Sequence, residues 1–143
     1  MHRVIAMSEP ERIKVAVIGA AGRMGSTVCQ AVIDAPDTEL VGRFDVGDDL
    51  QDLAGADVVV ELSVPDASLA NVLHCVGQGV HVVVGTTGWS PDKLEVLRSA
   101  VAAHGSVGVL IAPNFAIGAI LMMRFAQQAV SYTHLRAHET VLD

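Results

Sequence analysis

The chain has 143 residues, of which 51% are hydrophobic, 3% are aromatic and 17% are charged, and its formal net charge is −7. This length is typical of one domain, and the apolar fraction excludes an intrinsically disordered chain. The scarcity of aromatic residues favours an α/β core over a β-sandwich, and the acidic balance argues against nucleic acid as a partner.

Short apolar runs alternate with helical patterns along residues 13–112. The runs predict strands over 13–18, 39–44, 57–62, 80–84 and 107–112. The patterns between them predict helices over 23–35, 48–53, 67–76 and 91–104. We expect Asp66 to cap the third helix and Ser90, followed by Pro91, to cap the fourth. This alternation predicts an α/β fold, a doubly wound parallel sheet of the Rossmann type.

A last helix is predicted over residues 117–130. Its sequence is apolar nearly all round, so we expect it to pack against more protein than this chain supplies. His134 and His138 follow at a spacing that would place both on one helical face, but no third metal ligand is evident and no metal site is predicted.

A glycine-rich turn joins the first predicted strand to the first helix. Residues 19–25 read GAAGRMG, a GxxGxxG variant of the dinucleotide-binding GxGxxG pattern. Gly19 would allow the sharp turn, Gly22 would let the backbone approach a pyrophosphate, and Gly25 would let the helix pack closely. The alternative is that these glycines serve turn geometry only.

Asp45 ends the second predicted strand, about 20 residues beyond Gly25, where a carboxylate commonly binds the adenosine ribose. Alternatively, it is one more member of an acidic stretch: residues 34–66 hold ten acids and one base, which predicts a solvated acidic face. Arg23 is expected either to meet a phosphate, including the extra one of NADP, or to be solvated. We assign His74, His81 and His104 to structural roles.

Loops after the later strands would lie at the same edge of the sheet, where ligands bind in such folds. Gly85-Thr86-Thr87-Gly88-Trp89 follows the fourth strand, Ala112-Pro113-Asn114-Phe115 follows the fifth, and Leu62-Ser63 ends the third. These loops can bring backbone and threonine oxygens against a nicotinamide or a substrate, although turn chemistry alone also selects glycine and threonine.

These segments resemble one enzyme family. VAVIGAAGRMG, Phe44-Asp45, VGTTG at 84–88 and IAPNFAIGA at 111–119 look like dihydrodipicolinate reductase, also called 4-hydroxy-tetrahydrodipicolinate reductase, over residues 13–130. The resemblance implies reduction of a cyclic imine-type intermediate of diaminopimelate and lysine biosynthesis with NADH or NADPH. It implies nucleotide contacts by Gly19, Ala20, Ala21, Gly22, Arg23, Met24, Asp45, Gly85, Thr86, Thr87, Ala112, Pro113, Asn114 and Phe115. Thr87 is also implied as a substrate contact.

After residue 130 the chain departs from this family, whose members continue into a second domain that carries the catalytic groups and most of the tetramer interface. Residues 131–143 form a polar tail with no catalytic pattern. We therefore expect a loose extension over 1–11, a dinucleotide-binding domain over 12–116, the first helix of an absent domain over 117–130, and a tail foreign to the family. No catalytic residue is assigned, no turnover by this chain is expected, and the family's homotetramer is not assigned to it.

Because Asp45 would oppose a 2′-phosphate, we expect NADH to bind at least as well as NADPH.

No apolar run reaches the about 18 residues of a membrane span, and no signal peptide is evident, so we expect a soluble cytoplasmic protein. Cys29 and Cys75 form no CxxC pair and are expected to be buried thiols.

Two alternatives remain open. One is another Rossmann-type NAD(P)-dependent oxidoreductase, such as the glucose-fructose oxidoreductase type, which typically shows Glu-Lys-Pro where this chain has Gly-Thr-Thr-Gly. The other is a nucleotide-sensing regulatory domain, which needs the glycine loop and Asp45 but has no use for the APNF segment.

Overall fold

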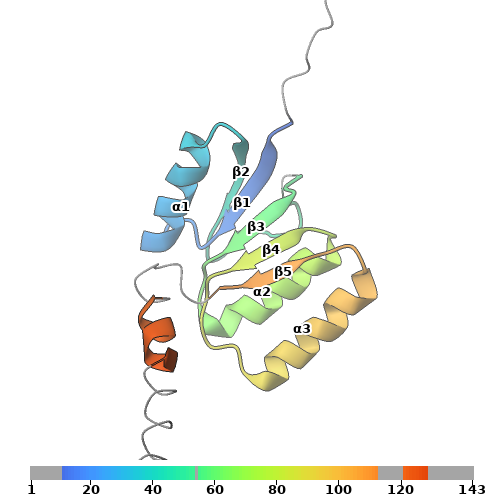
Figure 1. The fold of residues 1–143 in the computed structure, drawn as a ribbon. Coiled ribbons are helices and arrows are strands. Elements are labelled where there is room, and N and C mark those ends of the chain that lie inside the picture. The colour runs from blue at the N-terminus through green and yellow to red at the C-terminus, as the bar shows by residue number, and fades with distance from the viewer. Residues whose placement is uncertain (1–10, 54, 113–120, 129–143) are drawn as a thin grey trace, which may run out of the picture. The chain divides into compact units, whose positions relative to one another are not determined.

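The computed structural model describes residues 11–53, 55–112 and 121–128 (Figure 1). The chain divides into two units, residues 1–112 and 113–143. In the second unit, residues 121–128 are helical, within the helix predicted over 117–130; the rest of that prediction lies outside the described residues. Within the described ranges, no helix is both long enough and apolar enough to cross a membrane.

The first unit is built on a parallel sheet of five strands. These are β1 (Ile13–Ile18), β2 (Thr38–Phe44), β3 (Val58–Glu61), β4 (His81–Val84) and β5 (Val109–Ile111). Their spatial order is β2-β1-β3-β4-β5, and every neighbouring pair is parallel. The chain therefore leaves β1 toward one edge and returns to build β3, β4 and β5 toward the other. The direction of sheet growth therefore reverses between the neighbouring strands β1 and β3. Their carboxyl ends mark the topological switch point, where such sheets bind ligands.

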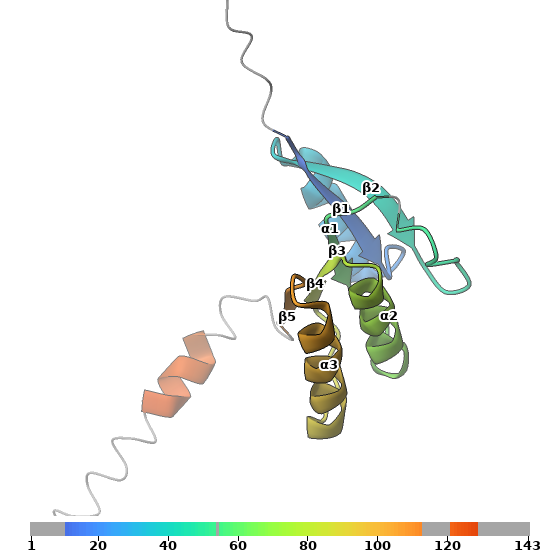
Figure 2. The same ribbon diagram turned by 90° about the vertical axis from the view of Figure 1, so that its right-hand side faces the viewer.

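Helices cover both faces of this sheet. Figures 1 and 2 show α1 (Arg23–Asp34) on one face and α2 (Pro65–Gly77) and α3 (Pro91–His104) on the other. Successive side chains of β1 alternate between the two cores: Ala16 and Ile18 belong to one apolar cluster, and Val17 belongs to the other with Cys29 of α1. Burial on both faces explains why β1 is continuously apolar from Val15 to Ile18. The predicted doubly wound sheet is confirmed.

The helix predicted over 48–53 is not formed. The structure has turns there instead, because short acidic side chains bond to nearby backbone amides. Asp48 Oδ2 accepts from the Asp45 amide at 2.6 Å, and Asp49 Oδ1 accepts from the Gln51 amide at 2.9 Å. β3 and β5 are also shorter than the predicted runs.

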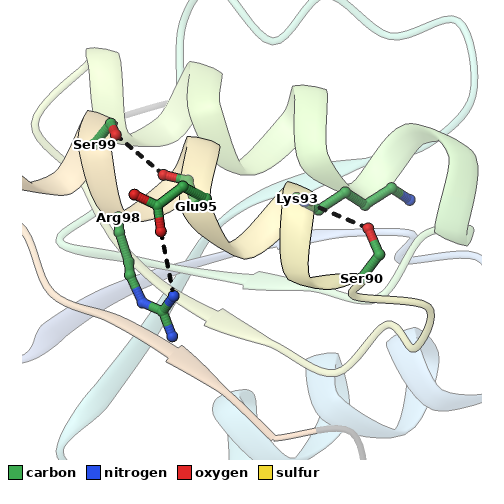
Figure 3. A network of polar contacts seen from close by, with 5 residues as sticks. All are labelled: Ser90, Lys93, Glu95, Arg98 and Ser99. Atoms are coloured by element: carbon green, nitrogen blue, oxygen red, sulfur yellow. Dashed lines mark hydrogen bonds and ion pairs between the residues drawn. The ribbon is translucent and has the colours of Figure 1, made fainter.

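Of the two predicted helix caps, Ser90 is confirmed and Asp66 is wrong. Ser90 is the N-cap of α3, and its Oγ accepts from the Lys93 amide at 3.4 Å (Figure 3), as predicted. Asp66 is not the cap of α2: the N-cap is Val64, and Pro65 is the first helical residue. Proline is pre-organised for that position, so the helix begins earlier and Asp66 lies inside its first turn, where its charge still suits the helix dipole.

Candidate functional site

A cavity of about 470 Å³ opens at the carboxyl ends of β1, β2 and β3, at the switch point. It is lined by Ile18, Gly19, Gly22, Asp45, Val46, Gly47, Asp48, Leu50, Leu62, Ser63, Val64, Ala67 and Asn71. The fold thus brings together three segments that the sequence singled out separately: the glycine loop, Asp45 and Leu62-Ser63.

The glycine loop is held so tightly that two of its positions have no room for a side chain. Gly19 has a φ of +80°, and a Cβ there would lie 2.4 Å from the Leu62 carbonyl oxygen. A Cβ on Gly25 would lie 2.0 Å from the Gly19 carbonyl oxygen. The amides of Gly19 and Ala20 donate to the Phe44 carbonyl at 2.8 and 3.1 Å, which fastens the loop to the end of β2. The sharp turn and close helix packing predicted from the sequence are therefore present.

The N-terminus of α1 faces this loop with its backbone amides uncapped. Gly22 is the N-cap, it provides no side-chain oxygen, and the first turn contains no acidic residue. The first amides of a helix have no partner within the helix, and the dipole adds positive potential there. Such a terminus is suited to bind an anion, phosphate in particular. Arg23 and Met24, the first two helical residues, are exposed.

Asp45 lies across the loop from this helix end. Its Oδ2 accepts from the Ala21 amide at 2.5 Å, so the carboxylate is anchored to the glycine loop itself. Among the described residues, its Oδ1 has a single long contact, 3.4 Å from the Val46 amide. The half-buried carboxylate therefore presents acceptor capacity to the cavity that it lines, beside Asp48.

Glu61 is the residue that the sequence reasoning missed. The solvated acidic face predicted over residues 34–66 is wrong for this side chain, which is 0% exposed at the end of β3. Its carboxylate is surrounded by Ser63, Ser68 and Asn71. A signal was available, since an acid that directly follows three valines in a strand covered on both faces is expected to be buried with them.

The loop after β4 lies beyond the residues that line the cavity, two strands from β1. The Gly85 amide donates to the Glu61 carbonyl at 2.9 Å, and the Thr86 carbonyl accepts from Trp89 Nε1 at 3.1 Å. Thr86 is buried, yet its Oγ1 has no hydrogen-bond partner among the described residues. An unpaired buried hydroxyl costs about 1–3 kcal/mol, which a bound polar group would relieve. Thr87 is exposed.

The segment after β5 is described only at its start. The Ala112 amide donates to the Val84 carbonyl at 2.8 Å, next to the loop after β4. Pro113, Asn114 and Phe115 lie outside the described residues.

Two of the three histidines have the structural roles that we predicted. His74 Nε2 lies 2.7 Å from the Leu50 carbonyl oxygen, and His81 Nδ1 accepts from the Gly108 amide at 2.8 Å. Cys29 and Cys75 are free and buried, also as predicted.

The sequence model described as "Dihydrodipicolinate reductase, N-terminus" matches residues 13–115. The chain belongs to this family. The match includes the strands of the sheet, the glycine loop and Asp45, and it confirms the resemblance inferred from the motifs.

Similar proteins agree with the family assignment. The 4-hydroxy-tetrahydrodipicolinate reductase of Cutibacterium acnes is 52% identical over 120 residues, and that of Beutenbergia cavernae is 54% identical over 121 residues. Each alignment covers 84% of this chain and 49% of the relative, so the chain spans about half the length of the curated relatives it matches. A dipicolinate-bound dihydrodipicolinate reductase from Paenisporosarcina sp. TG-14 matches in structure with a TM-score of 0.73 and 28% identity, over 85% of this chain and 54% of that one.

Proposed function

We propose that this chain is the NAD(P)H-binding portion of a 4-hydroxy-tetrahydrodipicolinate reductase. The observation that carries the proposal is the cavity at the switch point, where the glycine loop, the uncapped N-terminus of α1 and Asp45 meet in a member of this family. An anion-binding helix end opposite a carboxylate matches a pyrophosphate that lies next to a ribose.

The cavity has a suitable surface for each part of an adenosine diphosphate group. The amides of the first turn of α1, which begins at Arg23, would hold the pyrophosphate where the Gly22 backbone lets it approach, with the Arg23 side chain as an additional phosphate partner. The ribose hydroxyls would donate to Asp45. The apolar side chains of Val46 and Val64, which are 99% and 56% exposed, border the cavity and offer a surface for the adenine ring.

We assign the nicotinamide end to the loops after β4 and β5. Thr86 Oγ1, buried and without a partner among the described residues, would bond to a polar group of the cofactor. We retain the remaining nucleotide contacts implied by the family as part of this proposal: Ala20, Ala21, Met24, Gly85, Thr87, Ala112, Pro113, Asn114 and Phe115. For Ala20 this contact would come from the rim of the loop, because its amide is bonded to Phe44 and its side chain is buried.

Both cofactors are candidates, and we propose that NADH binds at least as tightly as NADPH. Asp45 and Asp48 line the same cavity, and two carboxylates there would repel a 2′-phosphate. Arg23 is the opposing charge, and it lies at the start of α1.

The reaction that we propose for the reductase is transfer of hydride from the nicotinamide to a cyclic imine-type substrate. Residues of this chain would bind and orient the cofactor, and Thr87 would contact the substrate. A cytoplasmic location and the family's homotetramer belong to the same proposal for the longer reductase.

Titration of NADH and NADPH into the chain, followed by nicotinamide fluorescence, tests the proposal. We expect Asp45→Ala to weaken NADH binding about tenfold or more, since a hydrogen bond to a charged group contributes roughly 1.5–3 kcal/mol. Asp37→Ala is the matched control, because Asp37 is an exposed aspartate at the opposite end of β2. Unchanged NADH affinity in Asp45→Ala would refute the ribose assignment, and failure of the unmodified chain to bind either cofactor would refute the function.

A further inference from the structure

The carboxylate of Glu61 is buried among hydrogen-bond donors. Oε2 accepts from Ser68 Oγ at 2.6 Å. Oε1 accepts from the Ser63 amide at 3.1 Å, from Asn71 Nδ2 at 3.4 Å, and from the Ser63 hydroxyl. No cation of the described residues forms an ion pair with it. This arrangement suits a group that only accepts, because each of its neighbours offers a hydrogen.

The network determines which way the Ser63 hydroxyl points. A hydroxyl has one hydrogen to donate and two lone pairs with which to accept. Two acceptors lie within reach of the Ser63 hydrogen, the Glu61 carboxylate and, at a longer 3.5 Å, the Val64 carbonyl; the closer, charged Glu61 takes it. One lone pair of the hydroxyl takes the Asn71 Nδ2 donor at 3.1 Å. A second lone pair is left. Ser63 lines the cavity at the switch point, so it can offer a ligand there an acceptor but no hydrogen.

We propose that Glu61 is a positioning residue that makes the Ser63 hydroxyl an acceptor in the nucleotide cavity, so that it binds an N–H or O–H group of the dinucleotide. This inference rests on the proposed function. The cavity then has two different walls. The amides at the N-terminus of α1 attract phosphate, whereas Asp45 repels it and Ser63 offers it no hydrogen; both accept hydrogens from ribose or base. The cofactor would thereby be oriented by hydrogen-bond polarity as well as by shape.

A double-mutant cycle on NADH affinity separates this role from a general structural one. Glu61→Gln replaces one accepting oxygen with an N–H₂ donor, which, when it faces Ser63, occupies the second lone pair of the hydroxyl and leaves no acceptor for the ligand. Ser63→Ala removes the acceptor itself. We expect each substitution to weaken NADH binding about five- to tenfold, and the double variant to bind about as weakly as either single variant, because both remove the same contact.

Two controls are needed: one shows that loss of a hydroxyl elsewhere leaves NADH affinity unchanged, and the other shows that each variant is folded. Ser99→Ala deletes a hydroxyl that bonds to the Glu95 carbonyl on the exposed side of α3 (Figure 3), and its NADH affinity should equal that of the unmodified chain. Circular dichroism and thermal unfolding report whether each variant is folded. If Glu61→Gln does not fold, Ser63→Ala and Ser63→Thr decide the matter, because threonine keeps the hydroxyl and should restore binding.

The outcomes are distinct. If the unmodified chain does not bind NADH, the proposed function is overturned and this inference with it. If the chain binds NADH and folded Ser63→Ala binds it equally well, the inference alone is overturned. Losses that multiply in the double variant would also overturn it, since Glu61 would then act independently of Ser63.

Discussion

At the scale of single residues, close backbone contacts decide which positions accept a side chain. Gly25 has a Cα so near the loop that an added Cβ would overlap the Gly19 carbonyl oxygen and lie 2.8 Å from Ala20 Cα. Both contacts are with backbone atoms, which cannot swing away as a flexible side chain can. The requirement for glycine here comes from packing and would hold even if no ligand bound.

Gly25→Ala is therefore expected to lower the free energy of unfolding by about 1–3 kcal/mol or more, measured by urea denaturation. Gly77→Ala is the matched control: a Cβ at Gly77, in the last turn of α2, meets nothing within 4 Å. Alanine is the better helix former, so that variant should be unchanged or up to about 1 kcal/mol more stable. Equal stability of the two variants would contradict the packing argument.

Burial of the Cys75 thiol also makes the free energy of unfolding depend on pH in the alkaline range. Desolvation in the core and, to a smaller extent, the nearby Glu61 carboxylate together raise the pKa of this thiol from 9.0 to about 11. In the unfolded chain the thiol would ionise near pH 9, whereas in the folded protein it stays protonated. Folding stability is therefore fully retained below about pH 9 and falls as the pH rises toward 11.

We expect this effect to lower the free energy of unfolding by about 2 kcal/mol between pH 9 and pH 11. Urea denaturation of the unmodified chain and of Cys75→Ala at several pH values checks it, because the variant should show a shallower alkaline decline. Cys29→Ala keeps Cys75 and should keep the decline. Parallel pH profiles for the unmodified chain and Cys75→Ala would be inconsistent with this prediction.

At the scale of elements, the start of α3 shows how a local sequence pattern specifies a helix boundary. Ser90 caps the helix, Pro91 occupies its first position, and Lys93 Nζ reaches across to the Pro65 carbonyl at 2.9 Å, which links the starts of α3 and α2. Figure 3 shows the cap beside the exposed Glu95–Arg98 pair, whose atoms lie 3.5 Å apart. An exposed pair of this kind contributes little, so the cap is the more important contact.

Ser90→Ala should lower the free energy of unfolding by about 1 kcal/mol, because it removes an N-cap acceptor. Ser99→Ala, within the same helix, should change stability by no more than about 0.5 kcal/mol, since alanine favours helix and that hydroxyl bonds only to a carbonyl in the preceding turn. Thermal unfolding of both variants provides the comparison. The cap would have no energetic role if the two melted at the same temperature.

Other elements show where local patterns fail. Residues 48–53 carry helix-compatible spacing, yet the structure has turns there, because Asp48 and Asp49 bond to local amides. The five strands of the described sheet, by contrast, were all predictable, because short runs of branched aliphatic residues near glycines and prolines favour buried strands.

At the scale of the whole molecule, the helical segment at 121–128 carries large apolar side chains on its surface. Leu121, Met122, Met123 and Phe125 are each between 46% and 71% exposed. Apolar side chains gathered on one short segment favour association with other apolar surfaces. We expect the 143-residue chain to self-associate at micromolar concentrations, which light scattering would detect.

Replacing both Met122 and Phe125 by glutamate should reduce that scattering, because charged side chains do not favour burial against a neighbour. The control is Ile33→Glu, which places a charge at an exposed apolar position of α1, in the other unit. Equal scattering from the unmodified chain and the Met122→Glu, Phe125→Glu variant would mean that another surface drives association.

The sequence by itself determined the alternation of elements, the parallel sheet, the glycine loop and the family, because these depend on neighbours along the chain and on motifs of fixed spacing. The three valines before Glu61 are a local signal of burial, but only the tertiary structure decided what surrounds each acid of residues 34–66. Asp45 directly follows β2 and Glu61 ends β3, both in the same acidic stretch, yet Asp45 borders the cavity and Glu61 is enclosed. The reason is physical: β3 lies inside the sheet between β1 and β4 and beneath α2, so the environment of its last residue is set by segments distant in sequence.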